Sequence, residues 1–190
     1  MHHRNRKFVL RNIDRKLIVQ SLVDTASISS PTGQEAELAE YLARKFEAVG
    51  LNTRMQHVNG LRNNVIGTLE GSGGGKSLLY VAHLDTSFPH YGGTLGGGRK
   101  DRGILAEHFD AKIVNNEWVI GIGVLNMKHA FSAFIGAIDA LRKSKAELRG
   151  DVIIAGVVGE IERAPVNGFQ GREYDGYGAG AKYLVTHGIT

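Results

Sequence analysis

Apolar runs of strand length alternate along this chain with longer segments whose apolar residues recur at helical spacing. This alternation constrains the fold more than any other feature of the sequence. The runs at 77–82 and 152–158 are almost entirely apolar, as in strands that are covered on both faces. Two strong helical patterns, at 36–49 and over Met127–Leu148, separate such runs. We therefore predict an α/β fold: a three-layer sandwich with a mainly parallel central sheet flanked by helices.

The weaker patterns complete this prediction. Thr32, followed three residues later by Glu35, is typical of a capping box, and Gly50 lies where a left-handed helix cap belongs. The other predicted elements are helices over Ile13–Ile28 and Ala181–His187, strands over Asn52–Val58 and Asn64–Leu69, and two short strands within Ile104–Ile120 around a turn at Asn115-Asn116.

The composition excludes several classes of protein. The 190 residues contain no cysteine, which rules out disulfides, thiolate zinc sites and cysteine nucleophiles. No stretch approaches the roughly 18 consecutive apolar residues of a membrane span, and no apolar signal region follows the basic start of the chain. The net charge is +4, and the basic residues are scattered without aromatic residues between them. We therefore expect solvated faces rather than a nucleic-acid partner. We predict a cytoplasmic protein that contacts no membrane.

Polar groups follow three of the predicted elements at positions where α/β folds gather their ligands. His83 and Asp85 come directly after the strand 77–82. An imidazole is a good zinc ligand, and a nearby carboxylate can fix its tautomer. Asn126 precedes the long second helix, where the alternative reading is a helix N-cap. Glu160 and Glu162 follow the strand 152–158, where a solvated loop is the alternative to a metal ligand or general base.

Taken together, these motifs resemble a known family. It is the co-catalytic zinc family of acetylornithine deacetylase, succinyl-diaminopimelate desuccinylase, aminoacylase and glutamate carboxypeptidase. The resemblance spans roughly Ile13 to the end of the chain and rests on three motifs in the family's order and spacing: Leu78 to Thr86, Gly121-x-Gly123-x-x-Asn126-Met127-Lys128, and Val158-Gly159-Glu160.

The resemblance implies a role for each matching residue. His83 would bind a metal ion, and Asp85 would orient the His83 ring. Asn126 would take the place of the residue that bridges two ions. Glu160 would be the general base that deprotonates the attacking water and then protonates the leaving nitrogen. The implied cofactor is one or two Zn²⁺ ions, with Co²⁺ or Mn²⁺ as substitutes. The implied substrate is a small molecule or short peptide with an amide bond. A full-length relative is expected to form a homodimer.

The sequence also departs from the family pattern. The family has Asp where this chain has Asn126, so a bridge between two cations loses one negative charge and the second ion should bind more weakly. The second of the family's paired glutamates is replaced by Ile161, which cannot coordinate, and Glu162 is the alternative ligand if the loop turns differently. His129 replaces a usual glycine, and we expect it to lie on the helix surface. The family's next strand, its lid domain and its last histidine have no counterpart in residues 1–190, which predicts an N-terminal portion of a catalytic domain.

Two rival interpretations remain open at this stage. The segment 71–77 is close to a phosphate-binding loop, but Glu70 occupies the first position of that pattern, where a glycine belongs, and the segment leads into a strand rather than a helix. Both facts favour a flexible hairpin turn. The second rival is a non-catalytic relative that keeps the fold as a binding or interaction module, which Asn126, Ile161 and the absent downstream motifs favour.

Overall fold

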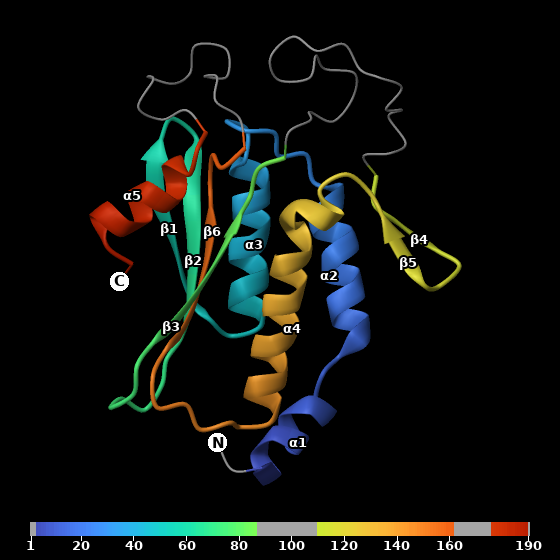
Figure 1. Ribbon diagram of the computed structural model, residues 1–190, viewed down its shortest axis with the longest axis vertical. Coiled ribbons are helices and arrows are strands. Elements are labelled where there is room, and N and C mark those ends of the chain that lie inside the picture. Colours follow the sequence, from blue (N-terminus) through green and yellow to red (C-terminus); the bar gives the residue numbers. More distant parts are fainter. Residues whose placement is uncertain (1–2, 87–109, 162–175, 190) are drawn as a thin grey trace.

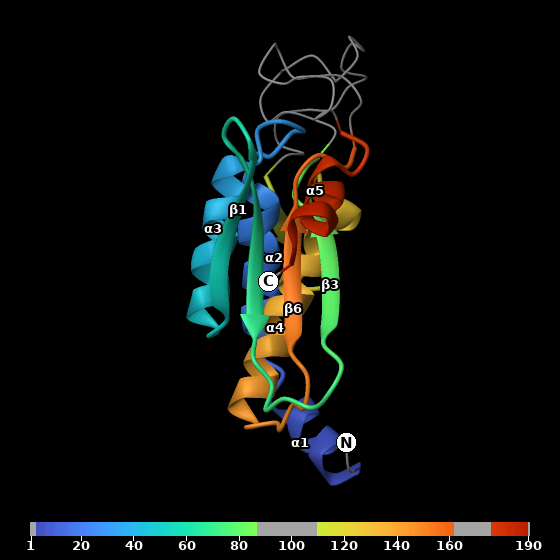
Figure 2. The same ribbon diagram turned by 90° about the vertical axis from the view of Figure 1, so that its left-hand side faces the viewer.

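The central sheet of the computed structural model has helices on both faces (Figures 1 and 2). The structure describes residues 3–86, 110–161 and 176–189. Within these ranges the elements are, in chain order, α1 (His3–Arg11), α2 (Arg15–Ser27), α3 (Ala36–Ala48), β1 (Asn52–Asn59), β2 (Arg62–Leu69), β3 (Leu78–His83), β4 (Lys112–Val114), β5 (Trp118–Ile120), a π-helical turn η2 (Val124–Lys128), α4 (His129–Lys143), β6 (Val152–Val157) and α5 (Ala179–His187).

The described part of the sheet has the strand order β1-β2-β6-β3. β3 and β6 are parallel, whereas the pairs β1/β2 and β2/β6 are antiparallel. The α/β fold with a central sheet and flanking helices is therefore confirmed, but this part of the sheet is mixed rather than mainly parallel. The two-residue connection between Asn59 and Arg62 makes β1 and β2 antiparallel, since so short a loop can join only antiparallel strands, and β2 in turn runs antiparallel to β6.

Alternating side chains of the strands build two cores, one on each face of the sheet. Val65 of β2 and Ile154 of β6 pack with α3 and α4 in the larger core, on the face that also carries α2. Ile66 and Ile153, their neighbours in sequence, pack on the opposite face with Leu184 of α5. The period of two along each strand thus yields the three predicted layers.

β3 differs from its prediction. The sequence indicated a strand covered on both faces, yet Leu78, Tyr80 and Val81 are 50%, 44% and 41% exposed. Within the described residues β3 pairs only with β6, so it lies at an edge of the sheet. Tyr80 still contacts Phe134 of α4, with ring centroids 5.4 Å apart, which keeps one face of the strand against the helical layer.

The predicted helices and turns are largely confirmed, with shifts at their ends. Gly50 has a φ of +80° directly after the end of α3, as a left-handed cap requires. Asn115 and Asn116 also have positive φ and form the turn between β4 and β5. The sequence analysis did not predict α1. The long helix predicted from Met127 is regular only over His129–Lys143, because η2 precedes it.

The rival phosphate-loop interpretation is not supported. Residues 71–77 lead into β3 and not into a helix. They are not a hairpin turn either, because β2 and β3 are separated by β6 and the segment crosses from one strand to the other. Asp151 organises the crossing by accepting a hydrogen bond from the Gly71 backbone N–H at 2.9 Å.

Candidate active site

The polar residues predicted from the sequence gather at the end of the sheet where β3 and β6 finish and α3 begins (Figure 1). His83 is the last residue of β3 and is 5% exposed. Its Nδ1 lies 2.9 Å from the backbone oxygen of Asp85 and 3.6 Å from the Asp85 carboxylate. A carbonyl oxygen can only accept, so this contact puts the ring proton on Nδ1 and directs the Nε2 lone pair away from Asp85.

Nε2 of His83 points to the two other predicted residues. It lies 3.1 Å from the amide Oδ1 of Asn126 and 3.8 Å from the carboxylate Oε2 of Glu160. The Glu160 side chain is 54% exposed, whereas the ring of His83 is nearly buried. An imidazole lone pair, an amide oxygen and a solvent-accessible carboxylate therefore converge at one point, an arrangement that attracts a cation or a proton.

Burial alone would lower the pKa of the His83 imidazole. In the protonated ring, Nδ1–H can donate to Asp85 and Nε2–H can donate to Oδ1 of Asn126. These hydrogen bonds outweigh burial and raise the pKa of His83 above the usual value of 6.5.

Asn126 does not cap the long helix, so the alternative reading of this residue is wrong. Lys128 is the N-cap of α4, and Asn126 lies within η2 with a φ of −128° and a ψ of 95°. This extended backbone turns the amide toward His83. His129 is exposed, as predicted, and its Nδ1 lies 3.0 Å from the backbone oxygen of Val124.

The Asp85 carboxylate is fully buried and connects three segments of the site. It accepts hydrogen bonds from the Thr32 hydroxyl at 2.7 Å and from the backbone N–H groups of Glu160 and Ile161 at 3.0 and 2.9 Å. Burial would raise the pKa of Asp85, but the hydrogen bonds from His83, Glu160, Ile161 and Thr32 outweigh it and lower the pKa. Asp85 is therefore a buried anion that holds the backbone at Glu160.

A second buried carboxylate was misread in the sequence. Thr32 and Glu35 do not form the predicted capping box, and Glu35 makes no side-chain cap to α3. Thr32 instead donates to Asp85, and Glu35 forms a two-pronged ion pair with Arg62. The buried guanidinium offers a carboxylate two strong donors, which outcompete neutral helix N–H groups. Burial raises the pKa of Glu35, and Arg62 opposes that rise.

Lys128 is the other charged residue buried beside the site, with an exposure of 1%. Its ammonium donates to the backbone oxygen of Ile28, at the end of α2. Burial lowers the pKa of Lys128 to about 7, against the smaller opposing influence of Glu37.

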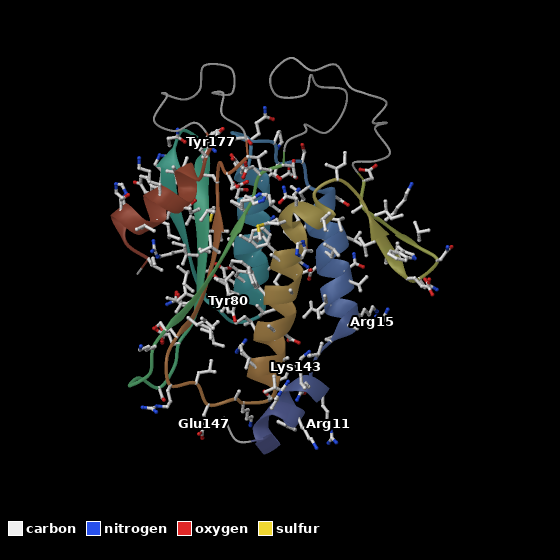
Figure 3. All side chains as sticks on the ribbon, in the orientation of Figure 1. Arg11, Arg15, Tyr80, Lys143, Glu147 and Tyr177 are labelled. Atoms are coloured by element: carbon white, nitrogen blue, oxygen red, sulfur yellow. The ribbon has the colours of Figure 1, made fainter. Side chains whose placement is uncertain are left out.

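Arg62, Tyr177 and the buried position of Lys128 were not predicted from the sequence. The backbone N–H of Tyr177 donates to the Glu160 oxygen at 3.0 Å, and its side chain is 63% exposed at the same end of the molecule (Figure 3). No local signal marks Arg62 or Tyr177, which reach the site through long-range contacts, and the motif that contains Lys128 gives no sign that this side chain is buried. Glu162, the alternative metal ligand, lies outside the described residues.

The described donors fit part of a metal site. His83 offers a neutral nitrogen, and Asn126 offers a neutral oxygen, both acceptable to Zn²⁺ or Mn²⁺. Catalytic zinc usually has three protein ligands. Within residues 3–86, 110–161 and 176–189, no group of three or more His, Cys, Asp or Glu side chains is placed to hold an ion. In the same residues no helix is both long and apolar enough to span a membrane.

No family model matches the sequence. Curated proteins similar to it include an N-formyl-4-amino-5-aminomethyl-2-methylpyrimidine deformylase from Halalkalibacterium halodurans, 29% identical over 145 residues that make up 75% of this chain and 32% of the deformylase. A putative [LysW]-lysine/[LysW]-ornithine hydrolase from Pyrococcus abyssi is 33% identical over 132 residues, 65% of this chain and 37% of the hydrolase. The chain thus spans about a third of the length of these relatives.

Solved structures share the fold. Human carnosine dipeptidase 1 superposes with a TM-score of 0.61 and 17% identity, over 78% of this chain and 33% of the dipeptidase. The Bacillus subtilis YxeP protein, described as a dinuclear metal binding peptidase of the M20 family, gives a TM-score of 0.54 and 18% identity over 97% of this chain and 40% of that structure. The resemblance predicted from the motifs is therefore confirmed: the chain is similar in sequence to a deformylase and a putative hydrolase, and similar in fold to solved metallopeptidases.

Proposed function

We propose, from the similarity to M20 metallopeptidases and to amide hydrolases, that this chain is the N-terminal portion of the catalytic domain of a metal-dependent amide hydrolase. Its substrates would be short peptides or N-acyl amino acids. The observation that carries the proposal is the convergence of His83, Asn126 and Glu160, which come from three segments far apart in sequence. Nε2 of His83 lies 3.1 Å from Oδ1 of Asn126 and 3.8 Å from Oε2 of Glu160.

The proposed roles follow from the chemistry of each side chain. His83 and Asn126 would hold a Zn²⁺ ion, together with ligands beyond the described residues, and the ion would polarise the substrate carbonyl. The buried His83 ring keeps its proton on Nδ1 through the Asp85 carbonyl, which leaves Nε2 free to act as a ligand. Asp85 acts through its hydrogen bonds and has no direct contact with substrate in this proposal.

Glu160 would be the general base. Its carboxylate is exposed enough to meet water, while its backbone N–H is fixed to the buried Asp85. Oε2 of Glu160 would accept a proton from the attacking water and then deliver it to the leaving nitrogen. This requires a carboxylate that is held in position at its backbone and remains accessible at its tip.

Metal binding and turnover test the proposal together. We expect the complete catalytic domain, of which this chain is the proposed N-terminal portion, to bind Zn²⁺ and to hydrolyse a dipeptide or N-acetyl amino acid. The His83→Ala variant should lose the ion. The Glu160→Gln variant should keep the ion and lose turnover by 10²-fold or more, on the order expected for a general base. Ser132→Ala is a control near the start of α4, because Ser132 is 2% exposed and its hydroxyl donates to the backbone oxygen of His129 rather than to a proposed metal ligand.

The second candidate is a binding module that keeps the fold without the reaction. Asn126 and Ile161 favour it, because a neutral amide and an aliphatic side chain stand where the resembled family has two carboxylates. Ile161 retains only a backbone role, donating its N–H to Asp85. A complete catalytic domain that binds none of Zn²⁺, Co²⁺ and Mn²⁺ and hydrolyses none of these substrates would refute the enzyme proposal and favour the binding module.

A further inference from the structure

The backbone that carries Glu160 is held by carboxylates at three consecutive N–H groups. Gly159 donates to Oε1 of Glu35 at 3.1 Å, Glu160 donates to both oxygens of Asp85 at 3.0 Å, and Ile161 donates to Oδ2 of Asp85 at 2.9 Å. Hydrogen bonds to an ionised acceptor are about twice as strong as neutral ones. Two buried anions thus hold the N–H groups of the loop, whereas the carbonyl groups of Gly159 and Glu160 accept from the backbone at 177–179.

Glu35 is itself locked by Arg62. Nε of Arg62 donates to Oε2 at 3.0 Å and Nη2 donates to Oε1 at 2.8 Å, with side-chain exposures of 3% for Arg62 and 0% for Glu35. The pair joins the start of α3 to the start of β2, two elements that do not contribute a side chain to the convergence at His83.

The guanidinium also lies directly against the loop. A Cβ added at Gly159 would come within 2.3 Å of Nη2 of Arg62, and Gly159 has a φ of +65°. Both the close approach and the left-handed backbone require glycine at this position. Gly159 therefore lies against the ion pair and directly precedes Glu160 in the chain.

We propose that the Glu35–Arg62 ion pair is the positioning device for the general base: it fixes Gly159 and thereby the direction in which Glu160 leaves β6. This inference rests on the proposed function for the role of Glu160, but the mechanical link from the pair to the loop can be tested without it. Neither Glu35 nor Arg62 touches the substrate in this account, so both are positioning residues.

Glu35→Gln is the most informative variant. The amide keeps one acceptor oxygen and replaces the other with an NH₂ donor, so at least one N–H of Arg62 or Gly159 faces a donor. Native-state amide exchange, read residue by residue by NMR, should show the Gly159, Glu160 and Ile161 amides exchanging about tenfold faster or more, relative to the Ile153–Val157 amides of β6 in the same sample. Arg62→Lys retains the charge but loses the fork, and should give a smaller change of the same kind.

Ile138→Val is the control, because Ile138 is 1% exposed on α4 in the larger core and its side chain makes none of the hydrogen bonds that hold the loop. It should accelerate exchange evenly, if at all. Equal acceleration at the loop and in β6 for both the Glu35 and Arg62 variants, or protection of the loop equal to that of the wild type, would overturn the proposal. If Glu35→Gln does not fold, Arg62→Lys decides by the same comparison.

Zn²⁺ titration of the same samples separates this inference from the proposed function. Wild-type protein that binds no Zn²⁺ would count against the proposed function, whereas the exchange comparison would still decide whether the ion pair holds the loop. Conversely, the wild type could bind Zn²⁺ while Glu35→Gln leaves the exchange rates of the loop amides unchanged. That result would refute the positioning role and leave the proposed metal site unaffected.

Discussion

The two segments that bring Glu160 and Asn126 to the site are held by buried charges of opposite sign and unequal pairing. The loop 159–161 is fixed by Glu35 and Asp85, and Glu35 is neutralised by the two-pronged contact with Arg62. The segment 123–128 is fixed by Lys128, whose buried ammonium donates to a neutral backbone oxygen.

This difference has an energetic meaning. A buried charge with a well-formed partner is costly to break, because removing one partner strands the other. A buried ammonium whose partner is a neutral carbonyl oxygen is costly to keep charged. Its pKa is therefore lowered, which favours the neutral amine. The first arrangement suits the loop that carries the proposed base, whereas the second leaves the Asn126 segment sensitive to pH.

The largest expected effect is on the paired side. Glu35→Gln should lower the free energy of unfolding by about 3–5 kcal/mol, as for other broken buried ion pairs. Urea denaturation of the wild type and variant measures the difference. Lys143→Gln is the control, because Lys143 is 49% exposed and pairs at the surface with Asp139 at 2.7 Å and with Asp14 at 3.8 Å, so its loss should cost much less. Equal losses in the two variants would erase the distinction between paired and surface charges.

The second effect is a pH dependence on the other side. Lys128 has a folded pKa of about 7, below its unfolded value of 10.5, so between these values the unfolded chain binds more protons. Stability should therefore rise with pH from about 7 to about 10.5, by at most about 1.4 kcal/mol per pH unit from this group. Lys128→Met should lack this rise. Denaturation series at several pH values would contradict the assignment if the two proteins changed in parallel.

A third effect concerns the charge missing at Asn126. Asn126→Asp adds a carboxylate beside His83, and we expect Zn²⁺ to bind about tenfold more tightly or more, a gain of about 1.4 kcal/mol. Calorimetric titration measures it. Asn116→Asp adds the same charge at the exposed turn between β4 and β5 and should leave Zn²⁺ affinity unchanged. A gain of similar size in both variants would point to a general charge effect instead.

The smallest effect is expected at Leu125, next to Asn126 in the same segment. Its side chain is 87% exposed, so Leu125→Ala should change the free energy of unfolding by less than about 0.5 kcal/mol. Thermal or urea unfolding provides the comparison with Lys128→Met. A large loss would show that surface contacts, rather than the buried Lys128, hold the segment.

Local patterns predicted the elements of the fold but not every environment. The helical spacing of Leu38 and Phe46 and the glycine at 50 correctly predicted α3 and its end, because these signals depend on neighbours along the chain. The burial of β3 was overestimated, since an apolar run records composition and not the number of strands that flank it. Its edge position depends on the order of the sheet.

The candidate site shows the same limit. Strand ends and motif spacing indicated His83, Asp85 and Glu160, and the structure brings these residues together. Glu35 was assigned to a cap because its partner Arg62 is 27 residues away, and no local pattern reports such a pairing. Residues that carry a motif could be predicted from the sequence, whereas residues that support them from other segments could not.

In the proposed function, Nε2 of His83 would bind an ion beside the Glu160 carboxylate, and that carboxylate would accept a proton from the attacking water. The most direct measurement is anomalous diffraction at the zinc edge from crystals grown with Zn²⁺. We predict a peak about 2.0–2.1 Å from Nε2 of His83, on the side facing Asn126 and Glu160. A map without a peak at His83, or with the ion bound only at other histidines, would contradict the account.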